Sequence, residues 1–467
     1  MTTAVRANEV AYRYPQNNHG LAPISLSVGP GERLLVTGPS GCGKSTLARC
    51  LTGLIPHLYH GTLQGEVWLG DQRTSVASLW QLAECAGIVF QNPAAQMLAH
   101  SVEEEIVFGL ENLGLPHQTI AERLEATLAR FGLEAMRDRS PQTLSGGEQQ
   151  KLALAAIIAR QPPVLILDEP LSMLDSTAAD DLVAHLVGLA DSGTTFIACE
   201  HREEYLQALP GLRTLRLEGM APPEVAALRA HPGGPPAHRL EVEGLSASLG
   251  GRPILRDLSF SLDSGQVVAI VGRNGVGKTT LLRSLAGLQK HEGSVRMNGS
   301  RPDLGLVFQN ADLQLFNATV REEILFRVTE PDMALYEWLL AALGLARYEQ
   351  SPPLLLSEGE KKRVALATVL MHQPRHGILL DEPSLGQDAA HKAMLIRLAR
   401  SLADSGRLVI LTTHDLPLAA QADHLALLGP AGFVTSGPPA EVLGDGAAWA
   451  QLGLSVPAWV HTAGHSL

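Results

Sequence analysis

The sequence is poor in aromatic residues, in cysteine and in long apolar runs, and each shortage excludes a class of protein. Aromatic residues make up only 4% of the chain, which argues against a surface that stacks nucleobases as the main activity. The four cysteines, Cys42, Cys50, Cys85 and Cys199, are too scattered for a disulfide framework or a zinc cluster and indicate a reducing compartment. No uninterrupted apolar run approaches the ~18 residues of a membrane span, so a membrane role would need spans from another chain.

Positive charge is also in short supply. Lys and Arg number 36 against 48 Asp and Glu, which gives a formal net charge of −12. Nucleic-acid binding depends on neutralised phosphates, so we expect no nucleic-acid partner. The 467 residues, 45% of them hydrophobic, are enough for several packed domains. The first fifteen residues lack the apolar core of a secretory signal.

The chain contains an internal repeat, because five motifs return in the same order. They are GPSGCGKST at 38–46 and GRNGVGKTT at 272–280, VFQN at 89–92 and 307–310, LSGGEQQKLALA at 144–155 and LSEGEKKRVALA at 356–367, VLILDEP at 164–170 and GILLDEP at 377–383, and Glu200-His201 and Thr413-His414. Between the copies, residues 229–238 read RAHPGGPPAH. Pro and Gly at this density break helix and strand, so we predict a linker here and domains at 1–228 and 239–467.

Each half is predicted to have an α/β core. Short continuous apolar runs are typical of strands that are buried on both faces of a parallel sheet. Helical stretches alternate with these runs, which favours an α/β architecture. The expected strands are 33–37, 164–167, 267–271 and 378–380, and the expected helices are 44–51, 119–131, 278–285 and 390–403.

The pattern GxxxxGK[ST] occurs once in each half and predicts a polyphosphate site. Glycines let backbone N–H groups close around the phosphates, the lysine reaches the outer phosphates and the hydroxyl joins Mg²⁺. Lys44 with Ser45, and Lys278 with Thr279, take these parts. The other expected contacts are Gly38, Pro39, Ser40, Gly41, Cys42, Gly43 and Thr46 in the first half and Gly272, Arg273, Asn274, Gly275, Val276, Gly277 and Thr280 in the second.

An Asp-Glu pair ends a buried apolar run in each half. An isolated pair of this kind is usually a helix cap or surface charge, but here each pair occurs in a chain with phosphate loops. We expect Asp168 and Asp381 to hold Mg²⁺ through water. Glu169 and Glu382, one residue further on, are placed to orient or deprotonate a water that attacks the γ-phosphate.

Taken together, the motifs resemble those of the ATP-binding-cassette ATPases, twice and over nearly the whole chain. LSGGEQQ resembles the signature segment of that family, VFQN its Q-loop, residues 171–175 and 384–388 its D-loops, and His201 and His414 its switch histidines. The resemblance implies tandem duplicated P-loop NTPase domains of the α/β class. Each domain would have a mostly parallel sheet core, an antiparallel β subdomain and a helical signature subdomain.

The resemblance also implies that the two halves form an intramolecular, head-to-tail pseudo-dimer, in which each signature segment faces the phosphate loop of the other half. The catalytic residues would be Glu169, Glu382, His201, His414, Gln91 and Gln309, with Gln91 and Gln309 also among the Mg²⁺ ligands. Site one would add Ser357, Glu358, Gly359 and Glu360 to the first phosphate loop. Site two would add Ser145, Gly146, Gly147 and Glu148 to the second.

Three positions depart from this pattern or add to it. Tyr14 is expected to stack on adenine, whereas the second half has Leu249 at the equivalent position. Glu358 stands where the first signature has Gly146, and its carboxylate either repels the γ-phosphate of site one or points away. We therefore expect unequal but competent sites. Cys42, inside the first phosphate loop, is either a small filler or a redox switch, which would need a lowered pKa.

The sequence that follows each Q-loop indicates a branch of the family. The pattern QNPxxQ…(S/T)VEEExxFGxENLGL resembles the ATPase components of energy-coupling-factor importers and of cobalt and nickel uptake systems. The resemblance implies a peripheral ATPase on the cytoplasmic face of the cell membrane. It would power uptake of a vitamin, vitamin precursor or metal ion through a transmembrane coupling subunit and a separate substrate-capturing subunit. The partner surface would be residues 93–105 and 311–323, where Met97, Leu98, Leu315 and Phe316 contact the partner or pack in the core.

Two other function classes share the layout of two cassettes. A soluble tandem cassette that acts on ribosomes or nucleic acid would have a long, charged, helical linker and basic patches, unlike this chain. A tandem sugar-importer ATPase commonly has a degraded second phosphate loop, and the text after its Q-loop differs. Co-purification with membrane proteins or with ribosomes separates these classes.

Overall fold

The structure is a computed structural model that describes residues 4–15, 20–39, 41–171, 174, 176–191, 193–201, 203–207, 209–218, 238–384 and 387–454. The chain divides into two compact units, Met1–Met220 and Ala221–Leu467. The predicted linker, apart from His238, lies outside the described residues, as do Ser40 and five positions of the two D-loops. The domain boundaries at 228 and 239 therefore stay predictions.

The first unit contains one antiparallel and one parallel sheet. The antiparallel sheet has the order β2-β1-β4-β5 and the parallel sheet the order β6-β7-β8-β3-β9. The strands are β1 (Val5–Arg13), β2 (Gly20–Val28), β3 (Arg33–Thr37), β4 (Thr62–Leu69), β5 (Gln72–Arg73), β6 (Ala86–Val89), β7 (Val164–Asp168), β8 (Thr195–Cys199) and β9 (Leu212–Arg216). The helices are α1 (Lys44–Leu51), α2 (Leu54–His57), α3 (Leu79–Cys85), α4 (Val102–Glu111), α5 (His117–Phe131), α6 (Gly146–Ala159), α7 (Ser176–Asp191) and α8 (Glu203–Leu206), with 3₁₀ turns at Pro93–Gln96, Glu134–Met136 and Pro141–Thr143.

The second unit repeats this plan with fewer elements between its phosphate loop and its Q-loop. Its sheets have the orders β11-β10-β13 and β14-β15-β16-β12-β17-β18, and β18 alone pairs antiparallel within the larger sheet. The strands are β10 (Arg239–Leu249), β11 (Arg252–Asp263), β12 (Val267–Val271), β13 (His291–Met297), β14 (Leu304–Val307), β15 (Gly377–Asp381), β16 (Leu408–Thr412), β17 (His424–Gly429) and β18 (Gly432–Gly437). The helices are α9 (Lys278–Leu285), α10 (Val320–Ile324), α11 (Met333–Ala342), α12 (Glu358–Met371), α13 (Ala389–Asp404), α14 (Leu416–Ala419), α15 (Pro439–Gly444) and α16 (Gly446–Gln451), with 3₁₀ turns at Ala311–Leu313, Ala346–Tyr348 and Pro353–Leu355.

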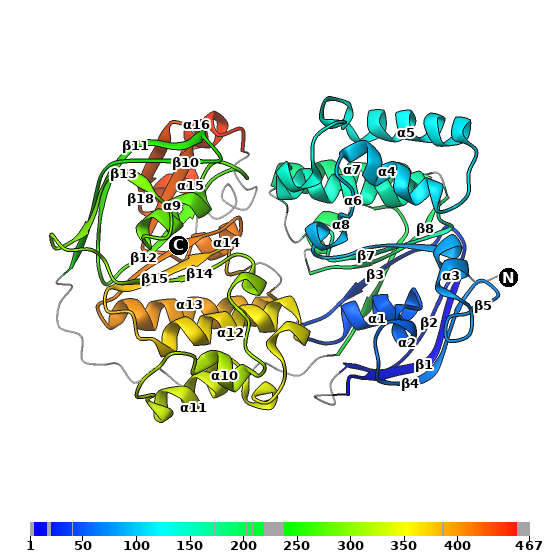
Figure 1. Ribbon diagram of the computed structural model, residues 1–467, viewed down its shortest axis with the longest axis horizontal. Coiled ribbons are helices and arrows are strands. Elements are labelled where there is room, and N and C mark those ends of the chain that lie inside the picture. Colours follow the sequence, from blue (N-terminus) through cyan, green and yellow to red (C-terminus); the bar gives the residue numbers. More distant parts are fainter. Residues whose placement is uncertain are drawn as a thin grey trace. The chain divides into compact units, whose positions relative to one another are not determined.

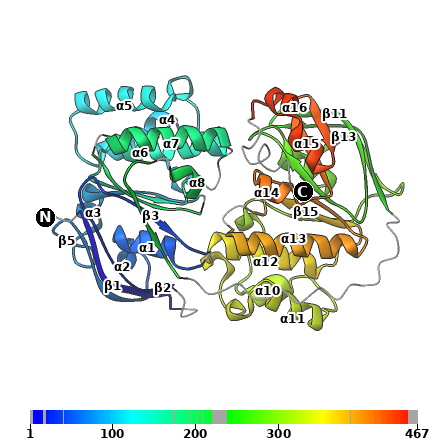
Figure 2. The ribbon, with the colours of Figure 1, turned by 180° about the vertical axis from the view of Figure 1, so that it is seen from behind.

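In each unit the parallel sheet separates two hydrophobic clusters. In the first unit, α1 and the antiparallel sheet lie on one side of the parallel sheet and α4 to α7 on the other (Figure 1). Alternate residues of β3 serve the two sides, because Leu34 and Val36 pack with α1 and the antiparallel sheet while Leu35 packs toward α4 to α7. This division explains the continuous apolar runs. Figure 2 shows the same layering in the second unit, where α12 and α13 cover one face of the sheet.

The structure confirms the expected fold class, with a parallel core and an antiparallel sheet in both units. The expected strands 33–37 and 267–271 and the helices 44–51 and 278–285 begin and end as predicted. Within the described residues, no helix has both the length and the apolarity that a membrane crossing requires.

Candidate functional site

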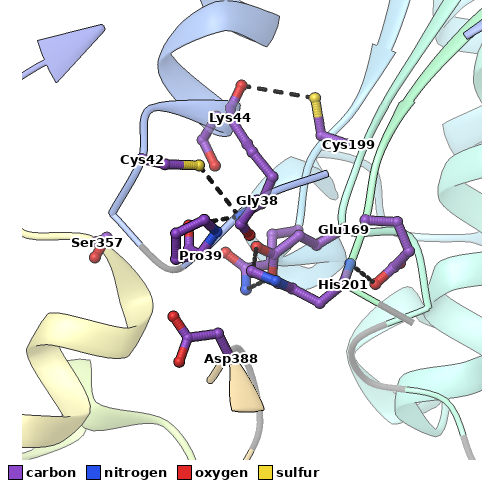
Figure 3. A network of polar contacts seen from close by, with 12 residues as sticks. Gly38, Pro39, Cys42, Lys44, Glu169, Cys199, His201, Ser357 and Asp388 are labelled. Carbon is purple, nitrogen blue, oxygen red and sulfur yellow. Dashed lines mark hydrogen bonds and ion pairs between the residues drawn. The ribbon is translucent and has the colours of Figure 1, made fainter. Parts of the chain in front are cut away.

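The first phosphate loop joins β3 to α1 and is shaped by glycines with left-handed backbone angles. Gly43 caps α1 at φ 101°, so Lys44 is the first helical residue. Its Nζ donates to the backbone oxygens of Gly38, at 2.9 Å, and of Pro39, at 3.1 Å (Figure 3). A Cβ on Gly38 would lie 2.6 Å from the backbone oxygen of Leu217, so only glycine fits there. The loop thus presents backbone N–H groups at a helix start, the geometry that binds phosphate.

The second phosphate loop has the same construction between β12 and α9. Gly277 caps α9 at φ 111°. Lys278 donates to the backbone oxygens of Gly272, at 2.8 Å, and of Arg273, at 3.3 Å. Unlike Lys44, its Nζ also lies 3.0 Å from Nε2 of His414. The second lysine therefore contacts the switch histidine of its own unit directly.

A hydroxyl and a carboxylate meet at the start of each of these helices. Ser45 Oγ donates to Asp168 Oδ1 at 2.9 Å, and Thr279 Oγ1 donates to Asp381 Oδ2 at 2.7 Å. Burial, with the neighbouring carboxylate of Glu169, raises the pKa of Asp168 to about 7. Burial also raises the pKa of Asp381, but its hydrogen bonds oppose that shift.

The hydrogen-bond partners of the two aspartates differ. Thr412 Oγ1 donates to the second oxygen of Asp381 at 2.8 Å. The first unit has Cys199 at the equivalent place, and its thiol instead donates to the backbone oxygen of Lys44 at 3.6 Å. The second aspartate is therefore held by two hydroxyls, one from the phosphate loop and one from β16.

The next residue in each unit, Glu169 or Glu382, has a strained backbone. Both have φ 49°, a left-handed angle that is uncommon outside glycine and costs of order 1–3 kcal/mol. Glu169 is held there by its N–H, which donates to the oxygen of Cys199 at 2.8 Å, and Glu382 donates to Thr412 in the same way at 3.2 Å. Sequence patterns do not reveal this strain.

In the first unit both oxygens of Glu169 are engaged. Gln91 Nε2 donates to Oε2 at 2.6 Å. His201, which Figure 3 shows beside Glu169, has its Nε2 3.0 Å from Oε1. Burial alone would raise the pKa of Glu169, but the contact with His201 and the charge of Lys44 lower it below its usual value. The structure thus brings Gln91, Glu169 and His201 together as the sequence predicted.

In the second unit Glu382 contacts the switch histidine and the phosphate-loop lysine. His414 Nε2 lies 3.1 Å from Oε1, and the N–H of His414 donates to Oε2 at 3.2 Å. Lys278 Nζ lies 3.7 Å from Oε1. Gln309 follows β14 and is half-buried. The two units therefore bring together the same residue types through different contacts.

Each predicted signature segment forms the start of a long helix. Ser145 caps α6 and Ser357 caps α12, and in both cases the side chain of the glutamate three residues later returns to the N–H of the serine. This reciprocal capping makes Glu148 and Glu360 structural groups. α6 begins with the two glycines Gly146 and Gly147, whereas α12 begins with Glu358 and then Gly359. The predicted pairing of each segment with the other phosphate loop stays a prediction.

Glu358, the departure in the second signature segment, is neutralised within its own unit. Lys361 Nζ lies 3.2 Å from Glu358 and 2.8 Å from Asp312 of the 3₁₀ turn Ala311–Leu313. The first unit has Gln149 and Ala94 at the equivalent positions of Lys361 and Asp312. An ion-pair network therefore joins the segment after the Q-loop to the signature helix in the second unit.

Lys362 is a buried neighbour of Glu382 that the sequence motifs did not indicate. Its side chain is buried and Nζ donates to the backbone oxygen of Glu382 at 2.8 Å. Burial lowers the pKa of Lys362 to about 8, although the carboxylates of Glu382, Glu358 and Asp381 oppose the shift. The first unit has Gln150 in this place, also buried.

We expect Lys362 to make the stability of the second unit depend on pH. An ammonium group that loses its proton at lower pH in the folded state than in the unfolded state stabilises the fold as the pH rises through that window. Relative to Lys362→Met, the wild-type free energy of unfolding should therefore rise by about 2 kcal/mol between pH 8 and 10. Urea denaturation at several pH values measures this difference, with the exposed Lys290→Met as the control. A pH-independent difference for Lys362→Met would contradict the expectation.

Tyr14 lies beside the first phosphate-loop helix, where the sequence places it. Its hydroxyl accepts from Arg49 Nη1 at 2.9 Å and lies 3.4 Å from Thr46 Oγ1. Leu249, at the equivalent place in the second unit, is exposed at the end of β10. The difference in chemistry expected for the adenine contact is therefore present, while the contact itself stays a prediction.

Cys42 fits the filler role better than the redox role. The side chain is buried inside the loop, and its Sγ is 3.8 Å from Lys44 Nζ. Burial raises the pKa of the Cys42 thiol, whereas a redox switch needs a lowered one. Cys50 and Cys199 are also buried, and Cys85 is half-buried.

The segment after each Q-loop is fixed to its sheet by a glutamine. Gln96 accepts from the N–H of Phe90 at 3.1 Å and donates to Ile88 at 3.1 Å. Gln314 makes the same two contacts, with Phe308 at 2.8 Å and Leu306 at 2.9 Å. Gln96 ends the sequence QNPAAQ and Gln314 ends its counterpart QNADLQ, so the last glutamine anchors each segment to the strand that precedes the Q-loop.

A buried glutamate shapes the end of the same segment. Glu105 Oε2 accepts from the N–H groups of Leu98 and Ala99, both at 2.8 Å. Glu323 Oε2 accepts in the same way from Phe316 and Asn317, both at 2.8 Å. The second pattern, VEEE or VREE, supplies these carboxylates from the first turn of α4 or α10.

This anchoring leaves large apolar side chains in solvent. Leu98 is 71% exposed and Phe316 64% exposed, whereas Leu315 is only 3% exposed and belongs to the core. Met97 is half-buried against the first-unit core. Of the four apolar residues for which the sequence left two roles open, Leu98 and Phe316 are thus displayed and Leu315 is packed.

Comparison with known proteins gives matches in both halves. The family profile described as ABC transporter matches residues 21–172 and 255–385. The "Putative HMP/thiamine import ATP-binding protein YkoD" of Bacillus subtilis (strain 168) is 34% identical over 484 residues, which cover 90% of this chain and 88% of that protein. A "Putative ABC transporter ATP-binding protein" of Treponema denticola is also 34% identical, with coverage of 86% and 89%.

Two further matches, one protein sequence and one solved structure, also have ABC transporter descriptions. A "Putative ABC transporter ATP-binding protein" of Streptomyces avermitilis is 33% identical over 517 residues, which cover 90% of this chain and 91% of that protein. Among solved structures, cbiO1 from Clostridium perfringens, described as part of the ABC transporter complex cbiONQ, is 28% identical. It covers 48% of this chain and 97% of its own, with a TM-score of 0.40.

Proposed function

Because the chain belongs to the ABC transporter family, as an ATP-hydrolysing protein with two ATP-binding cassettes, we propose that it is the ATPase of an importer of the energy-coupling-factor type. It acts at the cytoplasmic face of the cell membrane. It powers the uptake of a micronutrient through a transmembrane coupling subunit and a separate substrate-capturing subunit. The observation that carries this proposal is the anchored, apolar segment after each Q-loop, which repeats in both units.

Within each unit the residues divide the work of ATP hydrolysis. The phosphate loop binds the phosphates through backbone N–H groups, and Lys44 or Lys278 turns from the loop carbonyls to the outer phosphates. Glu169 or Glu382 orients the attacking water and accepts its proton. His201 or His414 contacts that carboxylate and holds it in place. Because Gln91 also occupies Glu169, it must move before water can reach that oxygen.

The residues present fit a magnesium ion. Ser45 with Asp168, and Thr279 with Asp381, bring a hydroxyl and a carboxylate oxygen together beside the phosphate loop, and Mg²⁺ prefers oxygen ligands. When bound, the ion supplies charge that neutralises the phosphate oxygens in the transition state. Gln91 and Gln309 are the further donors in this proposal. Burial raises the pKa of Asp168 to about 7, so a neighbouring positive charge is needed to keep the carboxylate ionised, which is the form that binds a metal ion.

We propose that each ATP site is completed by the signature segment of the other half. The starts of α6 and α12 offer the N–H groups of a helix N-terminus, which suit a phosphate ligand, and α6 also begins with two glycines. ATP then holds the halves together and hydrolysis releases them, which couples the chemistry to a rigid-body motion. The neutralisation of Glu358 by Lys361 supports a competent site one.

The partner surface consists of residues 93–105 and 311–323. An exposed Leu98 and an exposed Phe316 on rigidly anchored backbone favour contact with another protein. The same anchors connect this surface to Gln91 and Gln309, which lie between it and the sheet. A partner that moves the segment would therefore move Gln91 relative to Glu169.

We expect Leu98→Glu/Phe316→Glu to separate the ATPase from its membrane partner. Contact with an apolar partner surface would bury the two introduced carboxylates at a large desolvation cost, so the amount of integral membrane protein captured from detergent-solubilised membranes should fall at least tenfold. The ATPase rate of the isolated protein should stay within twofold. Val76→Glu/Leu288→Glu, at two other exposed apolar positions, serves as the matched control.

Mass spectrometry of the captured proteins decides between the function classes. Integral membrane proteins that disappear in the Leu98→Glu/Phe316→Glu variant support the importer, and ribosomal proteins would support the soluble class instead. Capture that is unchanged in this variant would contradict the assigned surface. The name of the Bacillus subtilis relative makes HMP and thiamine the first cargo candidates, and titrating the captured complex with HMP, thiamine and Co²⁺ distinguishes a vitamin or precursor from a metal ion.

A further inference from the structure

The residue before each switch histidine differs between the units. It is Glu200 in the first unit and Thr413 in the second. Glu200 is only 1% exposed, although it carries an acidic side chain. A buried carboxylate is costly unless hydrogen-bond donors surround it, so its partners indicate what the residue does.

The two oxygens of Glu200 accept from two separate backbone positions. Oε1 accepts from the N–H of His201 at 2.7 Å, and Oε2 accepts from the N–H of Leu171 at 3.1 Å. Leu171 comes two residues after Glu169, and the ring of His201 contacts Glu169 directly. The carboxylate of Glu200 therefore fixes both the chain that follows the catalytic glutamate and the histidine that touches it.

The backbone of Glu200 extends this connection to the phosphate loop. Its N–H donates to the oxygen of Val36 at 3.1 Å, near the end of β3 and just before the loop begins. One residue thus joins three segments of the site: the end of β3, the start of the D-loop and the switch histidine.

The second unit joins the same positions with different chemistry. Ser384 takes the place of Leu171, and its hydroxyl lies 3.1 Å from the hydroxyl of Thr413. The N–H of Thr413 donates to Ile270, the counterpart of Val36, at 3.1 Å. Both members of the pair differ between the units, Leu171 with Glu200 in the first and Ser384 with Thr413 in the second. A hydrogen bond between the two positions is present in both units. That joint change favours a functional requirement for the link over incidental burial.

We propose that Glu200 is a positioning residue for ATP hydrolysis in the first unit, where its carboxylate holds the start of the D-loop and the switch histidine in register around Glu169. The inference rests on the proposed catalytic role of Glu169. Thr413, with Ser384, does the same work in the second unit. The two N–H groups that the Glu200 carboxylate accepts from belong to His201 and Leu171, outside the phosphate loop, so its loss should slow the reaction more than it weakens ATP binding.

The test compares three substitutions in chains that also carry Glu382→Gln, so that turnover reports the first unit. Glu200→Ala should lower kcat at least tenfold and leave KM for ATP within twofold. Leu171→Ser/Glu200→Thr, which transfers the second-unit pair, should retain at least half of the original kcat. Glu200→Gln should fall between them, because an amide has one acceptor oxygen for two N–H groups. If Glu382→Gln alone abolishes turnover, the sites act together and the comparison is made with Glu382 intact.

The outcomes separate this inference from the proposed function. An unchanged kcat in folded Glu200→Ala, while Glu169→Gln is inactive, overturns the inference and leaves the function standing. A higher KM with unchanged kcat, or a Leu171→Ser/Glu200→Thr chain as slow as Glu200→Ala, also overturns it. Activity in Glu169→Gln itself would instead overturn the catalytic assignment. If Glu200→Ala does not fold, the nearly isosteric Glu200→Gln and the transferred pair decide the question.

Discussion

Replacing both carboxylates proposed as catalytic with amides, as Glu169→Gln/Glu382→Gln, is expected to lower the rate of ATP hydrolysis at least 100-fold while ATP still binds. Glutamine preserves size and hydrogen bonding but cannot accept the proton of the attacking water, and a general base contributes about 10²- to 10⁴-fold. Both glutamates are buried and stand on backbone at φ 49°. Since that geometry is fixed by neighbouring strands, no nearby carboxylate can replace them easily.

Steady-state turnover and equilibrium binding of ATP in the same preparations measure this effect. The exposed Glu84→Gln is a control for the loss of one negative charge in the first unit. A double variant with more than a tenth of the original turnover would remove the two glutamates from the catalytic role. Loss of ATP binding together with turnover would show instead that the substitution disturbs the phosphate loops.

The single variants should also reveal unequal sites. Tyr14 lies beside the first phosphate-loop helix and Leu249 takes its place in the second unit. An aromatic contact adds about 0.5–1.5 kcal/mol, so ATP should bind the first site about 2- to 12-fold more tightly. Binding to the Glu169→Gln/Glu382→Gln chain should therefore fit two affinities. Equal affinities, with equal loss of turnover in the two single variants, would contradict this expectation.

A second large effect is expected at the first glycine of a phosphate loop. In Gly272→Ala the new Cβ would lie 2.4 Å from the backbone oxygen of Leu428 and 3.1 Å from the side chain of Val276. A backbone oxygen of a central strand cannot move aside cheaply, so the loop or β17 must shift. We expect a loss of about 2–4 kcal/mol in the free energy of unfolding of the second unit. ATP binding to that loop should fall at least tenfold.

Gly275→Ala in the same loop provides the matched control. Gly275 has φ 78°, and a Cβ there would meet nothing within 4 Å. Its cost should therefore be only the ~1–2 kcal/mol of a left-handed alanine. Urea denaturation of the two variants compares a steric clash with backbone strain alone. Equal losses would show that the close approach to Leu428 does not limit the loop.

The elements around the site could be predicted from sequence because they are buried on both faces. The strand 267–271 is a continuous apolar run, and its residues alternate between two hydrophobic clusters, so neither face interrupts the pattern. The helices 44–51 and 278–285 begin immediately after a glycine that the phosphate loop requires. These features are local, which is why one sequence was enough to place them.

The orientation of side chains and the contacts between distant residues could not be predicted from the sequence. Leu315 and Phe316 are adjacent and both apolar, yet one is packed and the other is displayed. Their difference depends on the buried Glu323, seven residues after Phe316, which holds the backbone of the segment. Hydropathy alone cannot detect such an anchor, although the repeated acidic motif in both halves was a signal of it.

The role of Glu200 is signalled in the sequence only by comparison of the two repeats. Within one half, Glu-His is an unremarkable pair of polar residues. Aligned with Thr413-His414, it shows an acidic residue where the other copy has a hydroxyl, and the structure then shows that residue buried. Lys362 in the place of Gln150 is a similar signal. In a duplicated chain, the two repeats can thus be compared with each other position by position.

The two units differ in whether a thiol reagent can modify them, because they differ in cysteine content. All four cysteines belong to the first unit, and three of them are buried. A buried thiol reacts with an alkylating reagent only when the surrounding structure opens. The rate of alkylation of the buried thiols in the unmodified chain should thus report on the opening of the first ATPase half alone, without an introduced label.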